Sequence, residues 1–181
     1  MPNTSYPISI FVRNCMKLTC RIQRHDLIFK EPAGTSRGKM HRKETWFILL
    51  SEASDPDRTG IGEIGLLPGL SVEARPDIEK RLSGICHEIN TIARDPGKYL
   101  KEYPSVRFGL ETALLDLRTG GKRLLFPSPF TGGKAGIPVN GLIWMGSHDF
   151  MKRQIDKKIS EGYRCIKIKI GAIGFEEELG L

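Results

Sequence analysis

Two lysines spaced two residues apart, Lys167 and Lys169, are the side chains whose type and spacing most suggest chemistry. They alternate with isoleucines within residues 165–171, a pattern typical of a short β-strand that ends at Gly171. Side chains two apart on a strand share a face, so both ammonium groups lie on one face and the isoleucines on the other. Such a strand is either an edge strand with solvated lysines or the site of a lysine base. A like charge beside a lysine disfavours its protonation, which is a reason for two lysines rather than one.

Composition limits the classes of partner. The chain has 181 residues, of which 39% are hydrophobic and 27% charged, as in an ordinary soluble globular protein. Its net charge of +7 raises nucleic acid as a partner. The basic residues are scattered, however, apart from clusters at 37–43 and 152–158 that carry no interleaved aromatic side chains. A small-molecule substrate with carboxylates explains the excess equally well, so we expect no nucleic-acid partner.

The four cysteines, Cys15, Cys20, Cys86 and Cys165, show no CxxC pair and no metal-ligand spacing. They predict reduced, mostly buried thiols in a cytoplasmic protein rather than a disulfide framework or a zinc site. No segment is long enough to cross a membrane, so no membrane partner is expected. Residues 1–15 are interpreted as a leader of little structural weight, because Met16 is an alternative start.

The first two thirds of the chain predict strands and then helices. Alternation at 18–29 predicts a half-buried strand, 45–51 a strand buried on both faces, and 60–65 a glycine-rich strand. The turn formers at 31–38 and 55–57 predict the connecting loops. A tight loop is expected at 66–70. Three consecutive strands with short links indicate an antiparallel meander.

Two helices follow the meander. An apolar stripe after Pro76 predicts one helix that ends at 95–97. Ser105 is expected to cap a second helix, which ends at Gly120. The stripe of the first consists of Ile78, Leu82, Ile85, Ile89 and Ile92. Residues 16–121 are therefore predicted to form an α+β capping domain, a three-stranded antiparallel meander plus helices.

The pattern then changes to alternating strands and helices. Residues 122–136 are interpreted as a linker, and 137–144 as a strand. Ser147 is expected to cap a helix that buries Phe150, Met151, Ile155 and Ile159, and the lysine strand follows it. Residues 175–179 predict the opening of a further helix. Strand, helix, strand with short links is a βαβ unit with parallel strands. Two parallel strands do not cover both faces of a sheet, so residues 137–181 read as an incomplete domain.

Five motifs in this order resemble the enolase superfamily, and within it the o-succinylbenzoate synthase family of the muconate-lactonizing subgroup. They are 32–38 (PAGTSRG), 62–69 (GEIGLLPG), 113–117 (ALLDL), 140–146 (NGLIWMG) and 167–169 (KIK). The resemblance implies a capping domain followed by the first βαβ part of a TIM-type (β/α) barrel, with the site at the carboxyl ends of the barrel strands. It implies that Lys169 is the general acid/base, with Lys167 beside it and Mg²⁺ as cofactor.

The implied reaction is dehydration of a cyclohexadiene carboxylate that carries a succinyl side chain, a step of menaquinone biosynthesis. Ser36 and Arg37 would close over the substrate, where a guanidinium suits the succinyl carboxylate. Leu67, in the loop 66–70, would provide apolar cover. Trp144 would stack near the substrate ring, or else pack between strand and helix. Alternatively, the Arg37 side chain is solvated and does not bind the substrate.

The family's metal-binding carboxylates and second lysine belong to later barrel strands, which this chain does not contain. We therefore expect the 181-residue chain to lack the family's Mg²⁺ site and synthase activity, and the functional interpretation concerns the full-length enzyme. A dipeptide epimerase of the same superfamily is the alternative enzyme. A non-catalytic fragment that binds a partner is the alternative of another class. Whether the protein is a homo-oligomer is left open.

Overall fold

The structure, a computed structural model, describes residues 17–35, 38–171 and 173–180. The chain divides into two compact units. One holds the residues up to Leu27 together with Glu44–Pro127. The other holds Ile28–Lys43 together with Ser128–Leu181.

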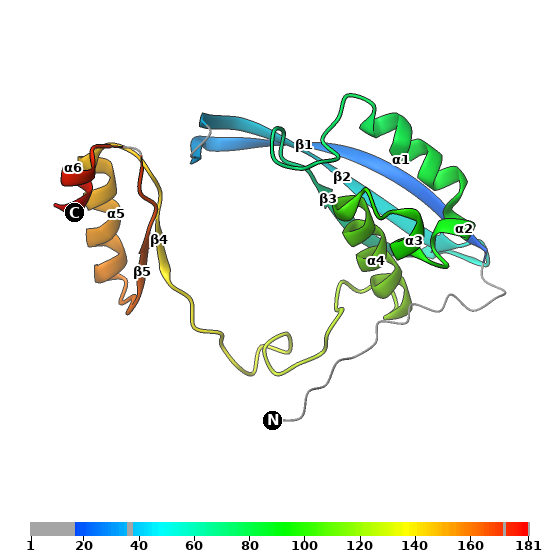
Figure 1. Cartoon of the computed structure of the whole chain (residues 1–181). Coiled ribbons are helices and arrows are strands. Elements are labelled where there is room, and N and C mark those ends of the chain that lie inside the picture. The colour runs from blue at the N-terminus through cyan, green and yellow to red at the C-terminus, as the bar shows by residue number, and fades with distance from the viewer. Residues whose placement is uncertain (1–16, 36–37, 172, 181) are drawn as a thin grey trace. The chain divides into compact units, whose positions relative to one another are not determined.

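A three-stranded sheet opens the described part of the chain (Figure 1). Its strands are β1 (Leu18–Thr35), β2 (Gly38–Glu52) and β3 (Asp55–Gly65), in the order β1-β2-β3. β2 and β3 are antiparallel, with Trp46 opposite Ile64 and Ile48 opposite Gly62. The predicted meander is thus confirmed.

The strands are longer than predicted. β1 runs on to Thr35, through most of the segment expected to be a loop. The turn between β2 and β3 lies at Ala53 and Ser54, so Asp55, expected in the turn, already begins β3. Strand pairing across the hairpins overrides the local turn preference of proline and aspartate at these positions.

Only one face of β2 is fully buried, although the sequence predicted burial on both. Trp46, Ile48 and Leu50 are buried, whereas Phe47 and Leu49 between them are partly exposed. The helices therefore pack on the face that carries Trp46, Ile48 and Leu50, and the sheet alternates as an antiparallel sheet with one covered face does.

Four helices follow the sheet, and α1 and α4 lie alongside it in Figure 1. They are α1 (Ile78–His87), α2 (Ile89–Ile92), α3 (Pro96–Tyr99) and α4 (Pro104–Arg118). All five residues of the predicted stripe are buried, but the single helix expected there is interrupted. At Glu88 the backbone adopts φ −96° and ψ 12°, outside the helical range, so α1 ends and α2 begins.

The predicted cap of α4 is wrong. Tyr103 is the N-cap and Pro104 the first helical residue, so Ser105 lies inside the first turn. The backbone N–H of Ser105 donates to Glu73 Oε1 at 2.5 Å, and Glu73 is buried. A carboxylate from the loop between β3 and α1 thus takes the place of the expected hydroxyl, and its charge also suits the positive end of the helix dipole.

The side-chain amide of Asn90 is hydrogen-bonded to β1 at the edge of the sheet. Asn90 Oδ1 accepts from the backbone N–H of Leu18 at 2.7 Å, and Asn90 Nδ2 donates to the carbonyl of Leu18 at 3.0 Å. Asn90 thereby joins the start of β1 to α2, 72 residues further along the chain.

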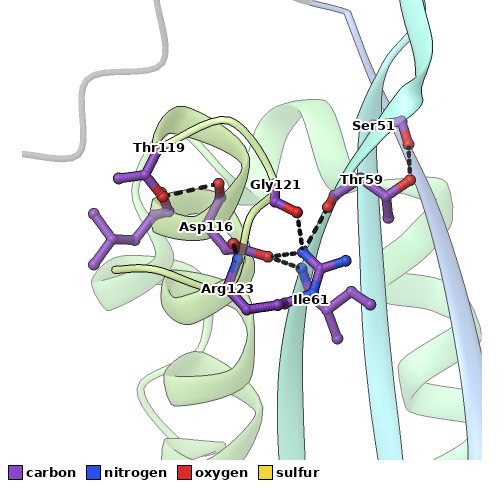
Figure 2. A network of polar contacts seen from close by, with 8 residues as sticks. Ser51, Thr59, Ile61, Asp116, Thr119, Gly121 and Arg123 are labelled. Atoms are coloured by element: carbon purple, nitrogen blue, oxygen red, sulfur yellow. Dashed lines mark hydrogen bonds and ion pairs between the residues drawn. The ribbon is translucent and has the colours of Figure 1, made fainter. Parts of the chain in front are cut away.

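A buried carboxylate, Asp116 on α4, organises the end of the helix (Figure 2). Its Oδ2 accepts from the backbone N–H of Ile61 on β3 at 2.9 Å and from Arg123 Nη1. Its Oδ1 accepts from the backbone N–H of Arg123 at 2.8 Å. Arg123 Nη1 also donates to the carbonyls of Thr59 and Gly121, at 2.8 and 2.9 Å. Strand, helix and the chain leaving the helix are thereby fixed to one another.

The cysteines differ from the prediction. Cys20 on β1 and Cys86 on α1 form a disulfide, with Cα atoms 5.0 Å apart. Cys165 is a free thiol, but it is exposed rather than buried. Cys15 lies outside the described residues. The pair is 66 residues apart in sequence, and only the packing of α1 beside β1 brings it together, so no spacing rule could reveal it.

Loss of this disulfide is expected to destabilise the first unit. Cys86→Ser removes a cross-link that closes a long loop, which costs about 3 kcal/mol of unfolding free energy and about 10–20 °C of thermal midpoint. Thermal unfolding followed by circular dichroism measures the shift, and reductant should reproduce it in the unmodified chain. Cys165→Ser is the control and should unfold like the parent. Two free thiols at Cys20 and Cys86 in the folded, oxidised chain would contradict the prediction.

The later part of the chain carries the predicted strand–helix–strand pattern. Residues 122–136 contain no helix or strand. The elements that follow are β4 (Gly141–Ile143), α5 (His148–Ser160), β5 (Ile166–Ile168) and α6 (Phe175–Leu179). β4 and β5 are parallel, so the predicted βαβ unit is confirmed, although both strands are shorter than expected.

Helix α5 is buried less completely than predicted. Ser147 caps it as expected, accepting from the backbone N–H of Phe150 at 3.4 Å. Met151 is fully buried, whereas Phe150 and Ile159 are 41% and 60% exposed. Two strands cover only a narrow part of the helix, which leaves the ends of its apolar stripe in solvent. Within the described ranges, no helix is both long and apolar enough to span a bilayer.

Candidate functional site

The two faces of the β4–β5 sheet differ in chemistry. Gly141 pairs with Ile166, Leu142 with Lys167 and Ile143 with Ile168. Because faces alternate along each strand, Gly141, Ile143 and the isoleucines share one face, and Leu142 shares the other with the lysines. Ile143 is fully buried, as is Met151 of α5. The lysine face is therefore the face turned away from the packed side of the sheet.

Continuing the register by one residue sets Trp144 beside Lys169, at the carboxyl ends of both strands. The ammonium nitrogen of Lys169 lies 4.1 Å from the centroid of the Trp144 ring, a cation–π contact. Trp144 is 41% exposed, so its ring is not packed away between strand and helix. Lys169 is half-buried and Lys167 is exposed. The structure thus brings two predicted site residues, Lys169 and Trp144, into contact.

A glutamine of α5 fixes the backbone of Trp144. Gln154 Oε1 accepts from the N–H of Trp144 at 3.0 Å, and Gln154 Nε2 donates to the carbonyl of Trp144 at 3.1 Å. The same Nε2 is 3.3 Å from the carbonyl of Phe150. Sequence reasoning did not single out Gln154, since a polar residue on an amphipathic helix carries no signal of a strand partner.

Lys158 on α5 contacts both an acid and an aromatic ring. Lys158 Nζ donates to Glu161 at 2.7 Å and lies 4.7 Å from the centroid of the Tyr163 ring. The hydrogen bond that Lys158 donates to Glu161 raises the pKa of Lys158 and lowers the pKa of Glu161. Lys158 is thereby held in its charged form and is unsuited to act as a base.

The predicted capping residues are only partly described. Ser36 and Arg37 lie outside the described residues, so their predicted contacts with substrate stay predictions. Leu67 is half-buried, and its carbonyl accepts from the backbone N–H groups of Leu70 and Ser71 at 3.0 and 2.9 Å. A hollow of about 140 Å³ beside this turn is lined in part by Trp46, Leu66 and Pro68.

The described residues do not fit a divalent metal. Among them, no group of three His, Cys, Asp or Glu side chains is placed to hold an ion. The three acids at the start of α6 include Glu178, whose Oε1 accepts from the backbone N–H of Gly171 at 2.5 Å. That carboxylate accepts a hydrogen bond from the turn that follows the lysine strand.

An antiparallel sheet with packed helices, followed by parallel strand–helix units, is the N-terminal architecture of the enolase superfamily. The crystal structure of MenC from Desulfotalea psychrophila matches 90% of this chain and 51% of that chain, with a TM-score of 0.66 and 33% identity. A dipeptide epimerase from Enterococcus faecalis, solved with Mg and a dipeptide, matches 91% of this chain and 48% of that chain. Its TM-score is 0.63 and its identity 18%, a likeness of fold alone.

Residues 20–117 match the family described as MenC, N-terminal domain. The chain belongs to this family. It is 41% identical over 198 aligned positions to an o-succinylbenzoate synthase of Desulfotalea psychrophila, an alignment that covers 92% of this chain. The same alignment covers 52% of the relative, so the chain spans about half the length of the synthase it matches.

Proposed function

We propose that this chain forms the N-terminal half of an o-succinylbenzoate synthase-like hydro-lyase, with Lys169 as its general acid/base. The observation that carries the proposal is the position of Lys169. It lies directly after the carboxyl end of the parallel strand β5, on the face opposite the buried Ile143, and barrel enzymes place their reacting groups at this end of their strands. The 41% identity to a synthase supports the choice of reaction within the superfamily.

The proposed substrate is 2-succinyl-6-hydroxy-2,4-cyclohexadiene-1-carboxylate. The neutral amine of Lys169 removes the proton next to the ring carboxylate, and the electron pair of that C–H bond passes into the carboxylate. The pair then returns to form the ring double bond as the C–O bond to the hydroxyl breaks. Lys169 gives its proton to the departing oxygen, so the products are water and an aromatic succinylbenzoate.

The remaining predicted residues take supporting roles in the proposal. Lys167 lies on the same face of the strand, two residues before the proposed base. Leu67, Ser36 and Arg37 cover the substrate from the capping domain. Mg²⁺ is proposed for the full-length protein because related epimerase structures contain it, and it would stabilise negative charge on the substrate carboxylate.

A chimera tests the role of Lys169. Residues 17–180 of this chain replace the matching half of the Desulfotalea psychrophila synthase, and dehydration is followed by the ultraviolet absorbance of the aromatic product. The chimera is expected to be active, and Lys169→Ala to lower kcat about 10³-fold, because general acid–base catalysis is removed. Lys152→Ala, which changes an exposed lysine of α5, is the control and should leave kcat unchanged.

Two outcomes would overturn the proposal. A Lys169→Ala chimera with undiminished dehydration would exclude the lysine as the base. A chimera that epimerises dipeptides but does not dehydrate the cyclohexadiene would favour the epimerase instead. The 181-residue chain alone is expected to dehydrate nothing, and a chain that retained activity alone would contradict that expectation.

A further inference from the structure

The backbone N–H and carbonyl of Trp144 are both hydrogen-bonded to a side chain rather than to another strand. Alternate residues of a strand direct their N–H and carbonyl groups to opposite edges. Gly141 donates its N–H to Cys165, and Ile143 accepts from Lys169, so these two residues face β5. The groups of Trp144 therefore point to the other edge of β4.

At that edge the side-chain amide of Gln154 bonds both backbone groups of Trp144. Its side-chain amide accepts from the N–H of Trp144 and donates to the carbonyl of Trp144, at 3.0 and 3.1 Å. A primary amide presents a donor and an acceptor side by side, as a backbone does, and it uses both here. Two hydrogen bonds to one residue fix the direction of its backbone, and hence where its side chain leaves the strand.

Trp144 in turn determines where the end of Lys169 lies. The lysine side chain has four rotatable bonds and no acceptor, so geometry is imposed on it by what surrounds the ammonium group. The indole ring lies 4.1 Å from that nitrogen. No ion pair between Lys169 and a carboxylate is found in the described part of the chain. The ring face is thus the described contact that holds the amine at the end of the strand.

We infer that Gln154 and Trp144 are positioning residues for Lys169: α5 fixes Trp144 through Gln154, and the indole holds the amine at the carboxyl end of β5. This inference deepens the proposed function and rests on it for its catalytic consequence. Lys169 becomes an ammonium ion when it takes the substrate proton, and the indole face attracts that cation.

Nuclear magnetic resonance of the 181-residue chain tests the contact without any reaction. Lysines are converted to ¹³C-dimethyl lysines, which keep their positive charge, and Lys169→Arg identifies the Lys169 signal. An aromatic ring face so near the nitrogen should displace this signal upfield from those of the other lysines. Trp144→Leu should abolish the displacement, Trp144→Phe should retain part of it, and Gln154→Ala should reduce it. The backbone amide signals of β5 report in each variant that the strand is still folded.

The chimera tests the catalytic consequence. Gln154→Ala and Trp144→Leu are expected to lower kcat about tenfold to a hundredfold, because a misplaced base loses near-attack geometry. Trp144→Phe should recover much of the loss, and a merely structural role would give no such recovery. Arg153→Ala, beside Gln154 on the exposed side of α5, is the control and should behave like the parent.

The two readouts separate this inference from the proposed function. An inactive chimera with a displaced, Gln154-dependent Lys169 signal would reject the proposed reaction and keep the positioning role. An active chimera in which the Lys169 signal is undisplaced, or is unchanged by Gln154→Ala, would overturn the positioning role alone. A loss of the folded β5 amide signals in Trp144→Leu would leave Trp144→Phe and Gln154→Ala to decide.

Discussion

Gly62→Ala is expected to lower the unfolding free energy of the first unit by about 4 kcal/mol, among the largest effects of any single substitution in this chain. A methyl group at Gly62 would lie 1.8 Å from the carbonyl oxygen of Gly109. That distance is far inside van der Waals contact, and the opposing atom belongs to the backbone of α4, which cannot rotate away. Strand and helix must therefore separate.

The close approach extends along the whole contact between β3 and α4. A methyl group at Gly60 would lie 2.1 Å from the carbonyl oxygen of Ala113, and one at Gly109 would lie 2.6 Å from Ile64 Cγ1. Gly60 and Gly62 lie opposite Leu50 and Ile48, so they belong to the face that the helices cover. The glycines of β3 are thus a packing surface for the helix backbone, and their lack of side chains sets the distance between the two layers.

Urea denaturation followed by circular dichroism measures the effect, with the slope m checked for unchanged two-state behaviour. Gly84→Ala is the matched control, because Gly84 lies within α1 and a methyl group there meets no atom within 4 Å. Replacing a helical glycine with alanine should raise the unfolding free energy by up to about 1 kcal/mol. A Gly62→Ala variant as stable as the parent would show that the layers are not in contact as described.

Asp116→Ala is the second substitution with a large expected effect. It removes the acceptor of two backbone N–H groups, those of Ile61 and Arg123, and the partner of the Arg123 guanidinium. Two backbone N–H groups left without their acceptor cost about 2–4 kcal/mol together, and the ion pair adds less because the Arg123 side chain is 49% exposed. The chain after α4 should also lose its fixed direction, because Arg123 then keeps only its contacts with the carbonyls of Thr59 and Gly121.

Two measurements check this expectation. Denaturation gives the loss of unfolding free energy, and hydrogen exchange should show faster exchange of the Ile61 amide in the variant than in the parent. Asp57→Ala, which changes an exposed carboxylate on the same strand β3, is the control and should stay within about 0.5 kcal/mol of the parent. Unchanged protection of Ile61 in Asp116→Ala would contradict the role of the carboxylate.

The fold was predictable where side-chain pattern determines it. The stripe from Ile78 to Ile92 is buried as its spacing predicts, and the change from a meander to a βαβ unit was visible in the order of the patterns. Contacts between distant segments were not predictable. The disulfide of Cys20 with Cys86 and the capping of α4 by Glu73 each join residues far apart in sequence, and local propensity contains no information about them.

The candidate site shows the same division. Alternation alone placed Lys167 and Lys169 on one face, and the resemblance suggested that Trp144 stacks near the substrate ring or else packs between strand and helix. The contact of Trp144 with Lys169 needed the strand register, which the sequence does not specify. Gln154 needed the packing of α5 as well, because its partners are backbone groups ten residues earlier in the chain.

The amide of Asn90 limits where another chain can pair with β1. β1 is an edge strand, and an unpaired edge is a template on which another chain can add a strand. Asn90 occupies both backbone groups of Leu18, where such an addition would begin. The edge is thus closed at its start by a neutral side chain from the same molecule.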